Sequence, residues 1–136
     1  MRVRAYVDGD NDALVALWAE VFADDPPWNA PRLIIPRKLG VQPELLLVAL
    51  VGEELVGALI AGFDGMRGWL HHLAVDPRWR GQGIGRALVE RALNGLRRHG
   101  CDKLNLQVRA DNHGVVAFYQ SLGFEVEPRI SMGRRI

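Results

Sequence analysis

The sequence predicts one α/β domain, spanning residues 1–136, in which a mixed, mostly antiparallel sheet carries helices on both faces. Two observations support this class. Apolar residues recur three and four positions apart in some segments, which indicates helices, and alternate or run together in others, which indicates strands. In chain order these segments read β-α-α-β-β-β-α-β-α-β-β, and the short links between the three central strands favour antiparallel pairing.

The N-terminal half is expected to form three strands and two helices. Residues 2–7 are the first strand, and a helix capped by Asp10 or Asn11 follows over about residues 11–23. Its apolar residues form one stripe that faces the core: Leu14, Leu17, Trp18, Val21 and Phe22. A second helix opens at Pro31 and extends to about residue 40, with Pro36 expected to end or kink it. The strands Leu45–Val51 and Leu55–Phe63 form a hairpin.

The C-terminal half begins with a turn at residues 64–68 and a central strand over Trp69–Val75. A helix is predicted over residues 83–99, ending at Gly100. Its core-facing stripe repeats every four residues, at Ile84, Leu88, Ala92 and Leu96. Lys103–Val108 is predicted to be a strand, residues 112–121 a short helix, and Phe124 to Ile136 one or two final strands.

Composition excludes several function classes. Hydrophobic residues make up 49% of the chain, which argues against disorder, and the net charge of +1 gives no reason to expect nucleic acid or an anionic membrane as partner. Cys101 is the only cysteine, so no internal disulfide forms, and we expect a buried structural thiol and a reducing, cytoplasmic location. The sequence shows no apolar leader and no metal-binding cluster. It leaves the oligomeric state open and allows a homodimer.

The most informative segment runs from Leu73 to Arg86 and reads LAVDPRWRGQGIGR. An apolar strand ends at a proline turn, three glycines follow at alternate positions, and an amphipathic helix begins. Glycine lets the backbone approach a ligand closely because it has no Cβ. A helix N-terminus directly behind the glycines presents unpaired N–H groups and a partial positive charge. The segment therefore predicts a site for the phosphate groups of a cofactor.

Two common phosphate-binding loops do not fit this spacing. A P-loop needs a Gly-Lys-Ser or Gly-Lys-Thr triplet, and the chain has neither. A dinucleotide fingerprint, G-x-G-x-x-G, would need its third glycine where this chain has Arg86 or Leu88. The basic and aromatic cluster at residues 78–80 lies in the same loop, where cofactor phosphates explain it better than nucleic acid does.

A third pattern does fit. Arg80, Gly83 and Gly85 resemble the R/Q-x-x-G-x-G/A signature of the GNAT family, the Gcn5-related N-acetyltransferases. A second segment runs from Asn112 to Tyr119 and continues into Leu-Gly-Phe at residues 122–124, and it resembles a downstream element of the same family. Both elements stand in the family's order, so the resemblance covers nearly the whole chain. The Pro-Trp-Asn trio at residues 27–29 resembles a subgroup of small, single-domain bacterial members.

The resemblance implies a GNAT-like fold and an acetyl-CoA-dependent N-acetyltransferase that releases coenzyme A. Its acceptor would be a primary amine on a small molecule or at a peptide or protein N-terminus. The alternative is a non-catalytic acyl-CoA-binding module that acts as a sensor or scaffold.

The resemblance also assigns roles to particular residues. The pyrophosphate would be held by the loop and the helix start, at Arg80, Gly81, Gln82, Gly83, Ile84, Gly85 and Arg86. The backbone of Leu73, Ala74 and Val75, on a bulged strand, would bind the pantetheine arm like an added strand, with the Leu73 N–H as oxyanion donor. Asn112 would lie beside the cofactor. Tyr119 would lie near the sulfur and donate a proton to the departing thiolate, because a phenol is protonated at neutral pH.

The general base is left open by the sequence. His71 and His72 precede Leu73, and strand alternation is expected to send them to opposite faces, so that at most one looks into the cleft. His72 is preferred because it adjoins Leu73. Asp64, Glu20 and an ordered water are the alternatives. By resemblance, the loop at residues 24–29 forms the wall of the acceptor pocket, with Trp28 as a recognition surface, a lid or a plug over the core.

Overall fold

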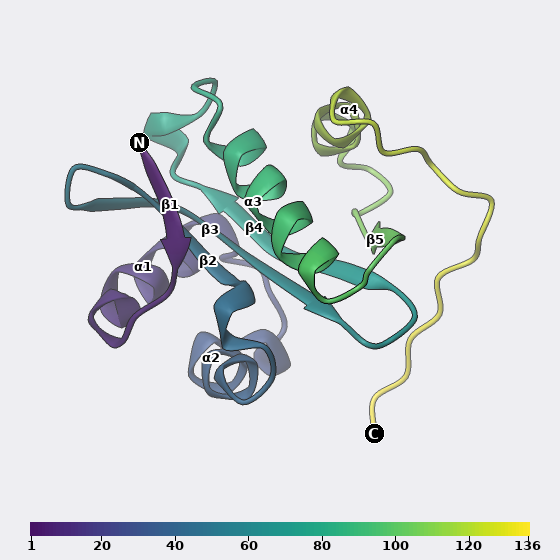
Figure 1. Ribbon diagram of the computed structural model, residues 1–136, viewed down its shortest axis with the longest axis horizontal. Coiled ribbons are helices and arrows are strands. Elements are labelled where there is room, and N and C mark those ends of the chain that lie inside the picture. The colour runs from purple at the N-terminus through teal and green to yellow at the C-terminus, as the bar shows by residue number, and fades with distance from the viewer.

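A five-stranded sheet forms the centre of the computed structural model, which describes residues 1–136 (Figure 1). The strands lie in chain order: β1 (Arg2–Ala5), β2 (Leu46–Val51), β3 (Glu54–Phe63), β4 (Gly68–Val75) and β5 (Leu104–Leu106). Neighbouring strands pair antiparallel except β4 and β5, which pair in parallel. The predicted mixed, mostly antiparallel sheet is therefore confirmed.

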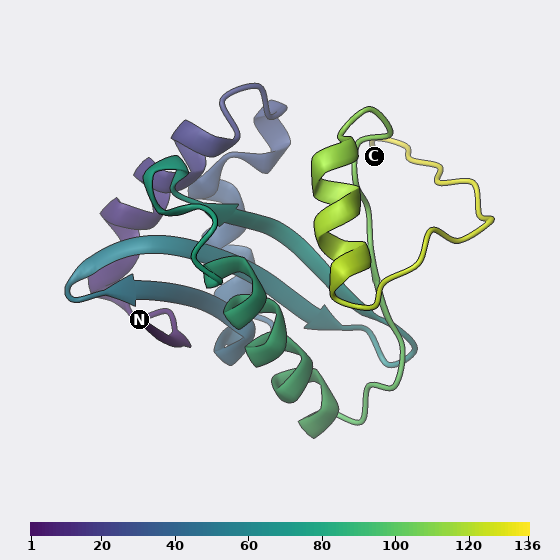
Figure 2. The ribbon, with the colours of Figure 1, turned by 90° about the horizontal axis from the view of Figure 1, so that it is seen from above.

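Helices cover both faces of this sheet, as predicted. Helices α1 (Asn11–Val21) and α2 (Pro31–Leu39) lie on one face, and α3 (Ile84–Arg98) lies on the other (Figure 2). Helix α4 (His113–Ser121) lies beside α3 at the β5 end of the sheet.

Strand β2 shows how the two faces are filled. Leu47 and Ala49 belong to the core under α3, whereas Leu46 and Val48 belong to the core under α1. A strand that is buried on both faces reads as a continuous apolar run, because neither face needs polar residues.

The predicted stripe of α3 is buried, and in that of α1 Leu14, Leu17 and Trp18 are buried while Val21 and Phe22 are half-buried. The other differences lie at the helix ends. Asp10 occupies the N-cap position of α1, but its carboxylate binds the Arg4 guanidinium at 2.7 and 3.0 Å and the Val7 N–H instead of capping the helix. Helix α1 ends at Val21 because Phe22 leaves helical geometry. Pro36 does not end α2, which continues to Leu39.

The prediction of final strands over residues 124–136 is wrong. This segment has no regular secondary structure and runs outside the sheet to the C-terminus (Figure 1). It contacts β5 and its flanks through side chains: Glu127 binds Lys103 and Asn105, and Ser131 binds Gln107. The segment alternates polar and apolar residues, which is why it resembles a strand in sequence. Pro128 has no N–H to donate to a ladder, and β5 offers only three residues to pair with.

Candidate active site

Strand β4 contains a β-bulge at His72 and Leu73. Ala58 of β3 pairs with Ala74 and Ile60 pairs with His71, so His72 and Leu73 together face the single residue between Ala58 and Ile60. His72 has a φ of 55°, in the left-handed region, which costs a non-glycine residue about 1–3 kcal/mol. The Trp18 indole N–H donates to the His72 carbonyl at 3.2 Å and holds the displaced peptide group.

The bulge places both histidines on the face covered by α1 and α2. The ring of His71 stacks on Trp69, two residues earlier, at 6.5 Å between centroids. The ring of His72 lies against Trp18 and Phe22 at 5.5 and 5.0 Å. The prediction that alternation sends the two histidines to opposite faces is therefore wrong, because the extra residue of the bulge reverses the alternation.

Beyond the bulge, one edge of β4 has no strand partner. The parallel ladder with β5 ends at the pair Leu70 and Leu106. The Asp76 N–H donates to the Val56 carbonyl, so alternation along the strand directs the peptide groups of Val75 and Leu73 to the opposite edge. The Arg80 side chain reaches this edge, where its Nε donates to the Val75 carbonyl at 3.2 Å. The three predicted pantetheine-binding residues, Leu73–Val75, thus lie along the stretch where β4 and the chain after β5 separate.

The loop that follows β4 is anchored by Asp76. Its buried carboxylate accepts from the Arg78 backbone N–H at 2.9 Å and from the Arg78 guanidinium at 2.6 and 3.1 Å. Hydrogen bonds to Arg78 are the main reason that the pKa of Asp76 falls to about 2. This carboxylate fixes the direction in which the chain leaves the strand.

The loop itself presents a row of free backbone donors. None of the N–H groups of residues 81–86 has an acceptor within the chain, and the first helical hydrogen bond of α3 comes from Ala87 to Gly83. Gly81 and Gly83 have φ of 78° and 80°, which favour glycine, and a Cβ on either would meet no atom within 4 Å. The Arg86 guanidinium lies near Glu90 at 3.7 Å and stays exposed. Six consecutive unpaired amides at the positive end of a 15-residue helix fit a pyrophosphate group.

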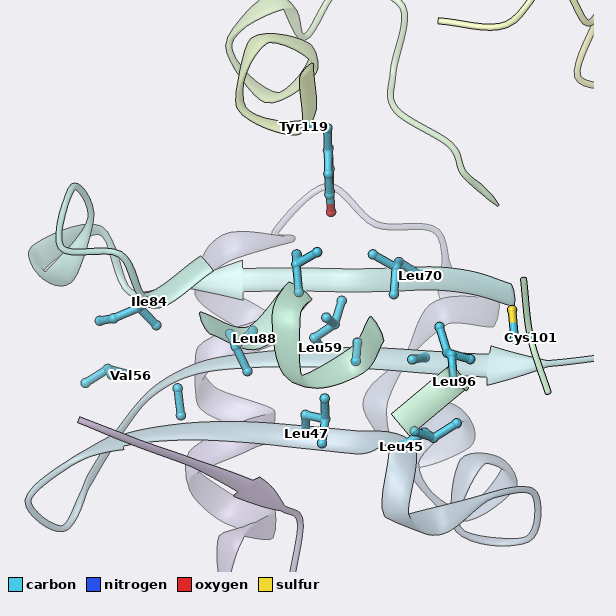
Figure 3. Packing of buried hydrophobic residues seen from close by; sticks show 14 residues of the cluster. Leu45, Leu47, Val56, Leu59, Leu70, Ile84, Leu88, Leu96, Cys101 and Tyr119 are labelled. Atoms are coloured by element: carbon cyan, nitrogen blue, oxygen red, sulfur yellow. The ribbon is translucent and has the colours of Figure 1, made fainter. Parts of the chain in front are cut away.

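Tyr119 lies on α4, and the ring of its neighbour Phe118 lies next to Gly85 at the start of α3. The residue is 7% exposed, and its ring packs between Phe118 and Phe124 at 5.1 and 5.4 Å. In Figure 3 the ring points from α4 toward the strand that carries Leu70, with the hydroxyl at its tip. This hydroxyl makes no hydrogen bond within the chain, and burial raises the pKa of Tyr119 to about 12. It is therefore a protonated donor with no internal partner.

Asn112 has a structural role at the start of α4. Its side-chain oxygen accepts from the Val115 N–H at 3.2 Å and caps α4. The cap fixes the start of the helix that carries Tyr119.

A second group of polar residues lies on the opposite face of the sheet. Nε2 of His72 lies 3.1 Å from Oδ2 of Asp25, and these side chains are only 16% and 24% exposed. They line a pocket of about 140 Å³ whose other walls are mainly apolar: Trp18, Ala19, Phe22, Pro26, Pro27, Asn29, Ala30 and Pro31. Sequence reasoning identified the 24–29 loop but not Asp25 as a partner of His72. No sequence signal links two residues that are 47 positions apart.

The other candidate bases lie outside this pocket. Asp64 accepts from the Met66 and Arg67 N–H groups in the turn before β4, and these bonds lower its pKa. Glu20 is exposed on α1. Desolvation, and to a smaller degree His72 and Lys38, lower the pKa of His71. Of the four side chains considered, His72 alone lines the pocket.

Trp28 does not line this pocket either. It is 45% exposed, and the Arg135 guanidinium lies 4.1 Å from the centroid of its ring. The structure therefore places it neither in the pocket wall nor as a plug over the core.

Comparison with known proteins agrees with this geometry. Residues 3–124 match the model of the acetyltransferase (GNAT) family. An acetyltransferase of Pectobacterium atrosepticum is 40% identical over 136 residues, which cover 100% of this chain and 96% of the relative. An uncharacterized N-acetyltransferase of Yersinia pestis is 39% identical with the same coverage. The chain belongs to the GNAT family.

Solved structures show the same fold at lower identity. The PaiA N-acetyltransferase from Thermoplasma acidophilum, solved in complex with coenzyme A, gives a TM-score of 0.79 at 20% identity, covering 95% of this chain and 92% of that one. The enzyme AAC(6′)-Iy, in complex with the bisubstrate analogue CoA-S-monomethyl-acetylneamine, gives 0.84 at 18% identity, covering 99% and 97%. Within this chain, no helix combines the length and apolar character needed to cross a bilayer.

Proposed function

We propose that this protein is an acetyl-CoA-dependent N-acetyltransferase that acts on a primary amine of a small molecule or of a peptide or protein N-terminus, and that it works in the cytoplasm. The observation that carries the proposal is the row of six unpaired amides at the start of α3, next to the unpartnered edge of β4. A diphosphate on an extended, amide-containing arm satisfies both features at once. The neighbour solved with coenzyme A supports the same ligand.

In this proposal each part of the site has one task. Acetyl-CoA supplies a thioester as the acyl donor. The amides of residues 81–86 bind the pyrophosphate, with Arg80 and Arg86 adding positive charge. The edge of Leu73–Val75 positions the arm, and the Leu73 N–H stabilises negative charge on the acyl oxygen.

Tyr119 completes this side of the site. Its hydroxyl is protonated at neutral pH, and it would donate to the departing thiolate. His72 is the proposed acceptor of the amine's proton, because it lies next to Leu73 on the other face of the same strand segment.

The alternative is an acyl-CoA-binding module without catalysis. The two are separated by measuring release of free thiol from acetyl-CoA across a panel of primary amines, together with calorimetric binding of coenzyme A. The proposal expects coenzyme A binding and amine-dependent thiol release. Binding without turnover on any amine of the panel would favour the module, and absence of binding would contradict both.

A further inference from the structure

The pocket between α1, the 24–29 loop and β4 has an unusual distribution of charge. Asp25 is its only carboxylate, and none of its ten lining residues is a lysine or arginine. Only one oxygen of Asp25, Oδ2, has a partner in the chain, the Nε2 of His72. Oδ1 makes no hydrogen bond, although the side chain is three-quarters covered. A shielded carboxylate with a free oxygen favours a cation close to it.

The other residues that line the pocket limit the kind of group to which that positive charge can be attached. Two aromatic rings, Trp18 and Phe22, and three prolines form most of the wall. Such a surface favours contact with apolar groups, and aromatic faces also attract ammonium groups. A volume of about 140 Å³ corresponds to roughly four or five non-hydrogen atoms if each occupies about the 30 Å³ of a liquid water molecule.

The position of the pocket relates it to the cofactor edge. His72 and Leu73 are the two residues of one bulge: the His72 side chain enters the pocket, and the Leu73 side chain packs with the core on the α3 side. Tyr119 belongs to that second core as well. The bulge therefore lies at the unpaired edge of β4 and directs one side chain to each face of the sheet.

We propose that this pocket selects a primary ammonium borne on a small, branched or short apolar group, with Asp25 binding the ammonium and His72 removing its proton. This inference rests on the proposed function and names the acceptor class for it. The Asp25 carboxylate holds Nε2–H of His72, which leaves Nδ1 as the basic nitrogen.

The proton and electron balance is simple. His72 takes one proton from R–NH₃⁺ and later releases it to water. The nitrogen lone pair of R–NH₂ forms the C–N bond of the amide while the C–S bond breaks. Tyr119 gives its proton to the departing sulfur and takes the second nitrogen proton in return, so the products are one amide and one thiol. The charged groups that face His72 are Asp25 from the loop and His71 from its own strand, with Lys38 of α2 close to His71.

The first test measures binding without any acyl transfer. Isobutylamine is titrated into the protein while the imidazole signals of His72 are followed by NMR, with isobutanol as a neutral probe of the same shape and 2-phenylethylamine as a larger amine. We expect saturable shifts with isobutylamine at millimolar concentrations, and affinities at least about tenfold weaker for the other two, which corresponds to about 1.4 kcal/mol. Equal binding of isobutanol, or stronger binding of 2-phenylethylamine, would overturn the inference.

A pair of neighbouring carboxylates gives a matched control. Asp25→Asn removes the charge from the pocket and is expected to weaken isobutylamine binding about tenfold. Asp24→Asn makes the same change of net charge at an exposed residue outside the pocket and is expected to leave binding unchanged. Circular dichroism checks that both variants fold. Equal effects of the two substitutions would overturn the role of Asp25.

The base is tested by kinetics on whichever amine of the panel reacts best. His72→Asn is expected to remove the rise of kcat/KM with pH that reports deprotonation of the base, whereas His71→Asn keeps it. A rising limb that survives in His72→Asn would exclude His72 as the base. Selective ammonium binding without transfer to any amine would contradict the proposed function alone. Transfer that ignores Asp25→Asn would contradict this inference alone.

Discussion

The two proposed binding sites on either side of the open edge of β4 use different parts of the chain, one the backbone and the other side chains. The proposed cofactor side is made of backbone: the unpaired amides of residues 81–86 and the strand edge at Leu73 and Val75. The proposed acceptor side is made of side chains from α1, the 24–29 loop and β4, namely Trp18, Phe22, Asp25 and His72. Backbone can bind one ligand in the same way in many sequences, whereas side chains can change with each acceptor.

This difference explains why the sequence predicts the residues of the proposed cofactor side better than those of the proposed acceptor side. A backbone site needs glycine where φ is positive or where a ligand approaches, so it leaves a fixed spacing in the sequence. The contacts of His72 with Asp25 and with Trp18 join residues 47 and 54 positions apart, and no spacing rule connects them. Single substitutions on each side test this contrast.

The largest effect is expected from Tyr119→Phe, which keeps the ring and removes the donor. We expect kcat to fall about 10²–10⁴-fold, the usual contribution of a general acid, with KM for acetyl-CoA little changed. Tyr6→Phe is the control, since Tyr6 is the only other tyrosine and its hydroxyl binds Asn11 far from β4. Steady-state kinetics decide the matter. If kcat of Tyr119→Phe stays within a factor of about two, the hydroxyl has no catalytic role.

Gly83→Val tests whether the backbone of the loop binds the cofactor. Gly83 has a φ of 80°, which valine tolerates poorly, and the new side chain would project from the row of amides. We expect coenzyme A affinity to fall at least about 100-fold, or about 2.7 kcal/mol, in calorimetry.

Gly65→Val is the matched control for this backbone strain. Gly65 has a φ of 98° and equally open surroundings, but it lies in the turn before β4. It should lose similar stability and keep its affinity. Equal affinities of the two variants would remove the central claim about the cofactor side.

Trp18→Phe tests the support of the bulge. Phenylalanine keeps an aromatic ring but cannot donate to the His72 carbonyl, which is left without its 3.2 Å partner. The expected loss is about 1 kcal/mol of unfolding free energy, measured by urea denaturation. Trp28→Phe, at an exposed position, should stay within about 0.5 kcal/mol of the parent. A fully stable Trp18→Phe would mean that the bulge does not depend on this bond.

The effect of removing the loop anchor, Asp76, depends on pH. The pKa of Asp76 is about 2 in the folded protein and 3.8 ordinarily, so its ionised form stabilises the fold fully above about pH 4. This contribution is lost as the pH falls from about 4 to about 2. Asp76→Asn keeps an acceptor for the Arg78 N–H and loses only the charge.

Its stability deficit should therefore be constant from pH 7 to about 5 and shrink as the pH falls to 2. Urea denaturation at several pH values measures the deficit. Asp102→Asn, an exposed carboxylate without an ion-pair partner, should show no such trend. A deficit of Asp76→Asn that is independent of pH down to 2 would contradict the prediction.

The prediction of final strands shows where local patterns stop being sufficient. Residues 124–136 alternate as strands do, yet they form no ladder, because pairing depends on what the neighbouring edge offers. His71 and His72 show the same limit of local patterns. Alternation predicts opposite faces for them, and one additional residue in the bulge brings both to the same face.

By itself, the sequence determined the features that depend on local spacing. These are the fold class, the stripes of α1 and α3, and the glycine loop with its helix start, which follow from periodicity or from the conformations that glycine allows. Asn112 and Tyr119 were identified through the resemblance to the GNAT family. Only the tertiary structure decided the position of the bulge at His72 and Leu73, the placement of both histidines on one face, and the pairing of His72 with Asp25. These depend on contacts between distant segments, and such contacts are set by how the packed layers meet.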